Sequence, residues 1–393
     1  PPAYTLASIF PLPEGLSEIL FSGLLNNRKY RYALSNEYFI PQDVDFCICG
    51  QVAENALKME GPFGDHLGYY SLAHPFPFLK NLKVYHKKDP IWHFTVVGRP
   101  PQEDSSFGYL IHTLVSALST SEYPGIRALH AVDAAGVHPL LLAIGSERYM
   151  PFREPVPEEI LTQANHLLGK GQTSLAKYLF IAADDAGCTL NIKDVPSFFS
   201  HILERANFHR DLHFYTKTTI DTLDYSGEGW NAGSKLVLAV HGPVLRNLGT
   251  SLSAFTNLPS AFTKARLIHK GIVALQTKSF KSYAEAEHEI KDLTEYFHNP
   301  LFAEYPLIIL VDDSEFVAKN FSNFLWISFT RSNPSHDVYG VQSGIENKHW
   351  HCDPPLIIDA RKKPHHAPEL TVDSETESKV TSYMQSHSIL RKF

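Results

Sequence analysis

Short apolar runs separated by polar residues dominate the first hundred residues, which is the pattern expected of β-strands. Runs rich in aromatic and β-branched residues predict strands at residues 33–41, 44–52, 83–86 and 91–97. Asp89 and Pro90 lie between the last two runs, and proline favours a turn because its φ is fixed. Residues 45–50 are almost continuously apolar, which predicts a strand buried on both faces.

The spacing of apolar residues changes to three and four at residue 105, as in amphipathic helices. We expect a helix that begins at Ser105 and Ser106 and continues to residue 118, followed by strands at 128–132 and 139–144. Further along, the pattern predicts a helix at 157–168, a buried strand at 179–185 and a helix at 195–205. Alternating strands and helices are typical of an α/β layer.

The second half of the chain repeats part of this order. A strand at 307–313 ends in two aspartates and precedes a helix at 317–330, as the strand at 179–185 precedes its own helix. Asp185 and Arg205 are 20 residues apart, and Asp313 and Arg331 are 18 apart. We predict two related α/β units, although two generic strand–helix units could also match by chance. A polar helix is expected at 282–297, and the polar tail after Leu370 is expected to lie on the surface.

Composition narrows the class of protein. The chain has 393 residues, 44% of them hydrophobic, which predicts two to three globular domains. Its net charge of −7 and its lack of basic blocks argue against a nucleic-acid partner. The apolar runs are far shorter than the ~20 residues that span a bilayer, and no secretory leader is evident. Four cysteines without a CxxC motif favour free thiols and a cytoplasmic location.

Several groups of residues could bind metal but are better explained structurally. Cys47 and Cys49 would point the same way from one strand, as two small core side chains do. The paired aspartates at the two strand ends are expected to cap the following helices. The histidines and cysteine at 349–352 and the histidines at 365–366 lack a regular zinc spacing.

Candidate chemistry is concentrated at residues 59–70, where three glycines and a proline force an irregular backbone. Glu60, Asp65 and His66 are three titratable side chains within seven residues. One interpretation is a hairpin with solvated charges. The other is a loop whose glycines allow a flat ligand to approach while two carboxylates face the reacting atom, an arrangement suited to general acid–base catalysis.

This stretch, Glu60-Gly-Pro-Phe-Gly-Asp-His-Leu-Gly-Tyr-Tyr70, resembles the signature loop of the UbiD-type decarboxylases, which use prenylated FMN; residues 60–70 are called the signature loop below. The resemblance runs in order from residue 1 to about 240. Its further segments are residues 11–18, 97–101, 178–185, 210–225 and 233–235.

The resemblance implies a role for five residues. Glu60 and Asp65 would belong to the catalytic network, with Glu60 as the proton donor after CO₂ is lost from a covalent adduct with the flavin. Glu18 would bind the divalent cation, Mn²⁺ or Mg²⁺, that bridges the flavin phosphate, with K⁺ as a further candidate ion. Ser8 and Pro11 would lie along the flavin. A helix-start glutamate exposed to solvent is the alternative for Glu18.

The fold expected is α+β. Residues 1–100 would form part of a flavin-binding split β-barrel, 101–245 an α/β domain that helps the family oligomerise, and 246–393 a second α/β unit with a polar tail. A C-terminal unit of this kind resembles the extension of the family members that act in menaquinone biosynthesis. This resemblance implies a dihydroxynaphthoate substrate. The resemblance thus implies an aromatic carboxylic acid substrate, a flavin prenyltransferase that supplies the cofactor, and a homo-oligomer.

The resemblance is incomplete at the start of the chain. The family's catalytic arginine, and the asparagine and histidine that complete its metal site, lie upstream of the segment that matches Pro1. We therefore expect the 393 residues of this chain to be the downstream part of a longer protein, or another chain to supply the missing part of the site. The alternative is a non-catalytic flavin-binding or assembly subunit.

Overall fold

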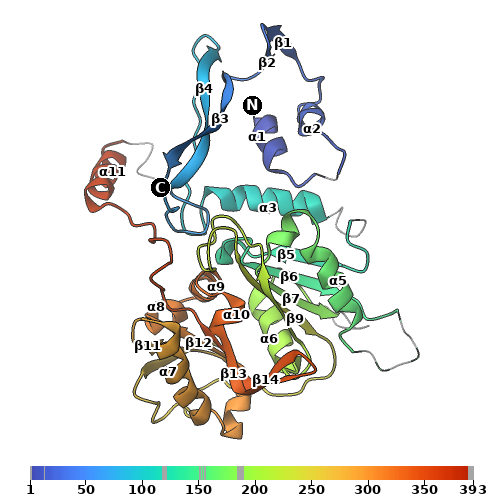
Figure 1. The fold of residues 1–393 in the computed structure, drawn as a ribbon, viewed down its shortest axis with the longest axis vertical. Coiled ribbons are helices and arrows are strands. Elements are labelled where there is room, and N and C mark those ends of the chain that lie inside the picture. Colours follow the sequence, from blue (N-terminus) through green and yellow to red (C-terminus); the bar gives the residue numbers. More distant parts are fainter. Residues whose placement is uncertain are drawn as a thin grey trace.

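The computed structural model describes residues 2–12, 14–116, 122–149, 152, 154, 156–183 and 190–387. Figure 1 shows an elongated molecule in which an N-terminal part lies at one end of the long axis and a middle unit and a third unit lie side by side toward the other end. The fold is mixed α and β, as predicted. None of the described helices has both the length and the apolarity that crossing a membrane requires.

The N-terminal part consists of two short helices and two separate hairpins. Its elements are α1 (Pro2–Ile9), α2 (Glu18–Leu25), β1 (Tyr32–Ser35), β2 (Tyr38–Pro41), β3 (Phe46–Glu60) and β4 (His74–His86). Each hairpin is a two-stranded antiparallel sheet, and the described strands do not close into a barrel. The long β3–β4 hairpin leaves many large apolar side chains exposed, among them Val52, Leu57, Met59, Leu82 and Val84.

Three strand predictions in this part need correction. The run at 45–50 begins β3 but is not buried on both faces: among the described strands β3 pairs only with β4, and the side chain of Ile48 is 48% exposed. The run at 33–41 is a hairpin rather than one strand, because Asn36 adopts a positive φ of 55° and reverses the chain between β1 and β2. The run at 91–97 is not a strand, since it joins no sheet in the described chain. Its first amide, that of Ile91, donates instead to the side chain of Asp45 at 3.3 Å.

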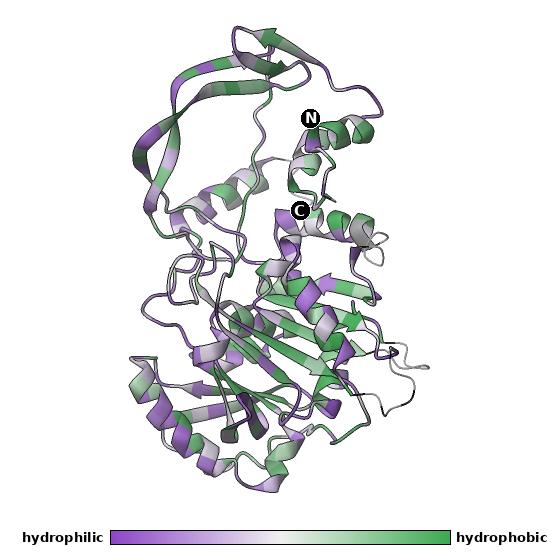
Figure 2. Ribbon diagram, turned by 45° about the vertical axis from the view of Figure 1, so that its right-hand side comes forward, coloured by the Kyte–Doolittle hydropathy of each residue, from purple (hydrophilic) through white to green (hydrophobic). Residues whose placement is uncertain are grey.

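The middle unit is a five-stranded sheet with strand order β5-β6-β7-β9-β8. Its strands are β5 (Ala128–Ala131), β6 (Leu140–Gly145), β7 (Tyr178–Ala183), β8 (Leu212–Thr218) and β9 (Gly233–Val240). Its helices are α3 (Glu103–Ser116), α5 (Glu159–Leu168) and α6 (Val195–Arg205). The central strands β6, β7 and β9 are parallel and buried along their whole length. Figure 2 shows these strands to be predominantly hydrophobic, as burial on both faces requires.

The third unit repeats this topology. Its sheet has the order β10-β11-β12-β14-β13, again with parallel central pairs and antiparallel edges. The strands are β10 (Phe262–His269), β11 (Ile272–Thr277), β12 (Leu307–Val311), β13 (Val338–Glu346) and β14 (His349–Asp359). The helices are α7 (Tyr283–Tyr296), α8 (Ser314–Ala318), α9 (Phe321–Thr330), α10 (Pro334–Asp337) and α11 (Ser374–Ser386). The two sheets therefore have the same strand order and the same arrangement of parallel and antiparallel pairs.

Helix starts explain the remaining differences. The single helix predicted at 317–330 is two helices, because Asn320 caps α9 by accepting the amide N–H of Asn323 at 2.8 Å. Asp313 caps α8 as predicted, whereas Asp184 and Asp185 lie outside the described residues. The helix expected to begin at Ser105 begins two residues earlier, at Glu103.

The middle and third units share one hydrophobic core. Phe329 of α9 packs against Tyr178 and Phe180 of β7, with ring centroids 5.0 and 5.9 Å away. The buried hydroxyl groups of Tyr178 and Ser332 are hydrogen-bonded at 2.7 Å. These contacts fix the two sheets relative to one another, and the signature loop lies against this pair of units.

Candidate functional site

The signature loop begins where β3 ends and turns back on itself before β4. The amide of Asp65 donates to the carbonyl of Tyr69 at 3.0 Å, and the amide of Gly68 donates to the carbonyl of Asp65 at 3.0 Å. Gly61 and Gly68 have positive φ angles of 86° and 89°, which other residues rarely adopt. A Cβ atom on Gly68 would lie 3.0 Å from Cα of Arg99 and 3.0 Å from the indole nitrogen of Trp326. The glycine therefore permits close packing against the protein itself.

The third unit binds this loop directly. The hydroxyl of Tyr69 is hydrogen-bonded to Thr330 at 2.8 Å and accepts a hydrogen bond from Nε of Arg331 at 3.2 Å. Arg331 also forms an ion pair with Glu369 at 2.6 Å. Next to Glu369 in the chain, the carbonyl of residue 368 accepts a hydrogen bond from the amide of Tyr70 at 2.7 Å. The loop is thus bound to residues that lie 261 positions or more later in the chain.

Asp65 and His66 form the buried polar centre of the loop. The Asp65 side chain is 5% exposed, and its Oδ1 lies 2.8 Å from Nδ1 of His66. Burial alone would lower the pKa of His66, but the hydrogen bond to Asp65 and the charges of Asp65, Asp221 and Asp104 together raise it above its usual value. Asp65 therefore orients the imidazole and favours a positive charge on it.

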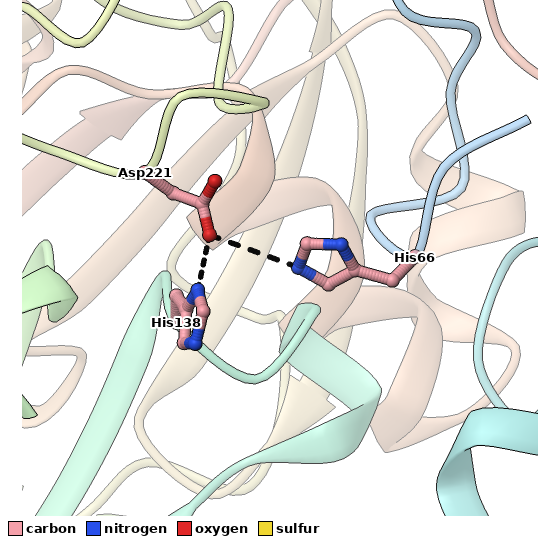
Figure 3. A group of neighbouring side chains, drawn as sticks. All are labelled: His66, His138 and Asp221. Atoms are coloured by element: carbon pink, nitrogen blue, oxygen red, sulfur yellow. Dashed lines mark hydrogen bonds and ion pairs between the residues drawn. The ribbon is translucent and has the colours of Figure 1, made fainter. Parts of the chain in front are cut away.

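Two further side chains complete a cluster around His66. His138 lies just before β6, and Asp221 lies in the loop after β8, so the middle unit supplies both (Figure 3). Nδ1 of His138 is hydrogen-bonded to Oδ2 of Asp221, and Nε2 of His66 lies 3.9 Å from the same oxygen. One donor atom from each of the three residues lies within 4.8 Å of the other two. The cluster joins the signature loop to the edge of the middle sheet where β6 begins.

The carboxylate of Asp221 is held in its charged form. Burial would raise its pKa, but the hydrogen bond and charge of His138 and the amide of Leu223 lower it to about 2. The Leu223 amide donates to Oδ1 at 2.9 Å, which leaves Oδ2 facing the two imidazoles. The sequence offered no spacing that would associate His138 with Asp221, because the two residues are 83 positions apart.

Glu60 occupies a different environment from Asp65. It is the last residue of β3, its side chain is 45% exposed, and its Oε2 lies 3.9 Å from Nε2 of His74. No hydrogen bond or ion pair joins Glu60 to Asp65 within the described chain. The two carboxylates each have a histidine partner instead of facing one another.

A cavity of about 580 Å³ begins beside His74. The His74 ring packs on Trp230 with centroids 5.2 Å apart, and both side chains line the cavity. Its remaining ring-bearing walls come from the middle and third units: Tyr225, Tyr283, His336 and His365. Its size and aromatic lining suit a small planar ligand.

The residues expected to hold the flavin and its cation lie on the N-terminal helices. The hydroxyl of Ser8 in α1 donates to the carbonyl of Thr5 at 2.8 Å, and Pro11 follows this helix in a half-buried position. Glu18 is the exposed first residue of α2, whose cap is Ser17. A hard cation needs about six oxygen ligands, and no described His, Cys, Asp or Glu gathers with Glu18 into a group of three. These residues alone do not fit a flavin phosphate with its cation.

The other metal candidates considered from the sequence form no such group within the described residues. The sulfur atoms of Cys47 and Cys49 lie 3.7 Å apart, and both thiols are free. Burial raises the pKa of the Cys352 thiol far above its usual value, so the sulfur stays protonated. His351 stacks on His209 with ring centroids 4.9 Å apart, which is a packing contact.

Two family descriptions match the chain. Residues 1–100 match the 3-octaprenyl-4-hydroxybenzoate carboxy-lyase Rift-related domain (UbiD), and residues 105–240 match the C-terminal domain of the same carboxy-lyases. The first match includes the whole signature loop with Glu60 and Asp65. The second includes His138 and Asp221.

Relatives match over nearly the whole chain. An uncharacterized protein of Chlamydia trachomatis serovar D is 35% identical over 98% of this chain and 63% of its own length. A Chlamydia pneumoniae protein, named as one subunit of a 4-hydroxybenzoate decarboxylase, is 34% identical over 97% of this chain and 62% of its own length. The chain thus spans less than two thirds of the length of these relatives.

A solved structure supports the fold. Vanillic acid decarboxylase of Sedimentibacter hydroxybenzoicus in its closed form superposes with a TM-score of 0.52 and 16% identity. The superposition covers 76% of this chain and 56% of the decarboxylase chain.

Proposed function

Because the chain belongs to the UbiD family of carboxy-lyases, we propose that it is part of a decarboxylase that removes CO₂ from an aromatic hydroxy acid. The observation that carries this proposal is the match over residues 1–100, which contains the signature loop with both carboxylates. The buried, oriented Asp65 and the cavity beside His74 are consistent with a site that handles protons on a planar acid.

The proposed substrate class rests on the name of one relative and on the cavity. One relative is named for 4-hydroxybenzoate, and the 580 Å³ cavity is large enough for one or two fused rings. We propose a hydroxylated aryl acid and, as the narrower assignment, a dihydroxynaphthoate of menaquinone biosynthesis. The imidazoles of His74 and His336 would face the carboxylate or hydroxyl groups of such a ligand.

Within this proposal Glu60 and Asp65 have separate tasks. Glu60, exposed at the end of β3, would deliver the proton to the carbon that loses CO₂. Asp65, buried and bonded to His66, would fix the orientation of the loop imidazole. The two roles agree with the different surroundings of the two carboxylates.

Prenylated FMN is the proposed cofactor, supplied by a flavin prenyltransferase, with Mn²⁺ or Mg²⁺, and K⁺ as a further ion. When bound, the prenylated flavin would act as the electron sink that loss of CO₂ requires. Glu18 would contribute one cation ligand, and Ser8 and Pro11 would lie along the flavin. The other ligands would come from polypeptide outside these residues, since the described part of the chain gathers no group of three His, Cys, Asp or Glu side chains around Glu18. We also propose a homo-oligomer.

The proposal is tested on the full-length protein produced together with a flavin prenyltransferase. We expect CO₂ release from 4-hydroxybenzoate or a dihydroxynaphthoate, and a loss of at least ~100-fold in kcat for Glu60→Gln. Glu54→Gln, at another exposed position of β3, is the matched control and should retain activity. Full activity of Glu60→Gln would refute the role of Glu60, and a colourless, inactive wild type would favour a non-catalytic subunit.

A further inference from the structure

We propose that His66, His138 and Asp221 bind a divalent transition-metal ion of the Zn²⁺ class, at a site separate from the cation expected near Glu18. Two imidazoles and a carboxylate are a donor set that zinc accepts in proteins, and three protein ligands leave a fourth position open. The three side chains come from three segments of the chain and converge on one point (Figure 3).

The spacing of the donor atoms fits one ion. Zinc–ligand distances of about 2.0–2.2 Å in a tetrahedron place neighbouring ligand atoms roughly 3.4 Å apart. Nε2 of His66 lies 3.9 Å from Oδ2 of Asp221, and all three donor atoms lie within 4.8 Å of one another. Small rotations of the side chains would therefore bring the donors to bonding distance.

The contacts behind the ligands are those of a prepared metal site. A metal-bound histidine commonly donates its other ring nitrogen to a carboxylate, and Nδ1 of His66 lies 2.8 Å from Oδ1 of Asp65. The opposite nitrogen, Nε2, is buried and has no hydrogen-bond partner, although it faces Asp221. The Leu223 amide binds Oδ1 of Asp221 and fixes that carboxylate as well. An unpartnered buried nitrogen is costly, and a metal ion would satisfy it.

The surrounding charge also favours a cation. Besides Asp221 itself, Asp65 contacts His66, and Asp104 lies close enough to act on the same imidazole. Within the described chain, no lysine or arginine forms an ion pair with Asp65 or Asp221. The side chains of His66 and His138 are 23% and 22% exposed and that of Asp221 is 9% exposed, so the cluster lies close to the surface. The open position would accept water or an oxygen of an anionic ligand.

The test measures metal binding and does not depend on decarboxylation. Full-length protein stripped with a chelator is titrated with Zn²⁺ in competition with a coloured chelator, and Co²⁺ serves as a spectroscopic probe of the ligands. We expect one tightly bound ion per chain and binding at least ~100-fold weaker in His66→Gln and His138→Gln. His209→Gln is the matched control, because His209 forms an unrelated pair with Asp353 at 2.7 Å.

Two further variants keep the outcome decisive. Asp65→Asn should weaken Zn²⁺ binding by about 10–100-fold, because it removes only the partner of a ligand. Glu18→Gln should leave Zn²⁺ binding unchanged, which separates this site from the flavin cation. Circular dichroism verifies that each variant is folded. If a histidine variant does not fold, Asp221→Asn is tested in its place. Equal Zn²⁺ affinity in wild type and the folded ligand variants would overturn the proposal.

Discussion

The indole nitrogen of Trp326 donates a hydrogen bond of 2.8 Å to the carbonyl oxygen of Leu67, which lies 259 residues earlier in the chain. Both residues are buried, and the Trp326 ring also stacks on Tyr69 with centroids 5.3 Å apart. The third unit therefore determines where the signature loop lies. This additional α/β unit is part of the support of the candidate site rather than a peripheral extension.

Replacing Trp326 by phenylalanine tests this support. Trp326→Phe leaves the buried Leu67 carbonyl without its donor, which should lower the free energy of unfolding by about 1–3 kcal/mol. Urea denaturation measures the loss. Trp230→Phe, at a side chain that is 59% exposed, is the control and should change stability little. Equal effects of the two substitutions would argue against a specific role for the Trp326 bond.

The backbone of the loop gives a second test. Gly68→Ala introduces a Cβ atom that would lie 3.0 Å from both Arg99 and Trp326, at a residue whose φ is 89°. We expect a loss of about 1–3 kcal/mol in stability and a displaced loop, because strain and a close contact act together. Gly108→Ala meets no atom within 4 Å and lies in α3, where alanine should be neutral or stabilising. Urea midpoints of the two variants measure the difference.

Much of the fold followed from local patterns. Buried central strands such as β7 and β12 are short apolar runs, and α6 was predicted within its observed bounds, because local periodicity reflects burial directly. Residues 91–97 have the composition of a strand but no partner strand in the described chain, and pairing is a long-range property that composition cannot report.

The candidate site was predictable only in part. The glycines and titratable residues of the signature loop stood out because they are adjacent in sequence. His138 and Asp221 did not, because only the packing of the middle unit brings them to His66. One of the two interpretations was that the glycines allow a ligand to approach, but Gly68 is approached closely by Trp326 and Arg99. A local signal can identify a tight approach but not the group that approaches.

The cavity beside the loop provides a test of substrate binding. Trp230→Ala removes the largest ring from its wall, and we expect KM for an aryl acid to rise about tenfold with a smaller change in kcat. Steady-state kinetics of the loaded full-length enzyme measure both constants. Tyr149→Ala, at a ring that is 82% exposed and outside the cavity, is the control. An unchanged KM for Trp230→Ala would place the aryl acid elsewhere.

A buried ion pair joins Lys363 and Asp337 in the third unit. Nζ of Lys363 lies 3.1 Å from Oδ1 of Asp337, and both side chains are completely buried. Lys363→Met would leave the buried Asp337 carboxylate without its ion-pair partner, so the free energy of unfolding should fall by about 3–5 kcal/mol. Lys362→Met, at the exposed neighbouring position, should cost far less. Chemical denaturation measures the free energy of unfolding of both variants. The double variant that combines Lys363→Met with Asp337→Leu should be more stable than Lys363→Met alone, because it no longer buries an unpaired carboxyl.

The contact between β8 and β14, which joins the two sheets, should make the stability of the protein fall in acid. His213 of β8 packs on His349 of β14 with ring centroids 5.3 Å apart, and burial, followed by the charge of His349, lowers the pKa of His213 to about 4. An unfolded histidine titrates near 6.5, so between pH 6.5 and 4 the unfolded chain binds more protons than the folded one. Stability contributed by the neutral ring is therefore complete above pH 6.5 and is lost as the pH falls toward 4.

Substitution of this histidine should reduce that loss. Because the ring is only partly buried, we expect His213 to account for about 1–2 kcal/mol of the stability lost between pH 7 and 4. His213→Gln should flatten the dependence of the unfolding free energy on pH by this amount, whereas His288→Gln, on the exposed face of α7, should not. Urea denaturation at several pH values measures both slopes. Identical slopes for wild type and His213→Gln would show that acid acts at other groups, because the two slopes differ only if His213 itself stays neutral in the folded protein.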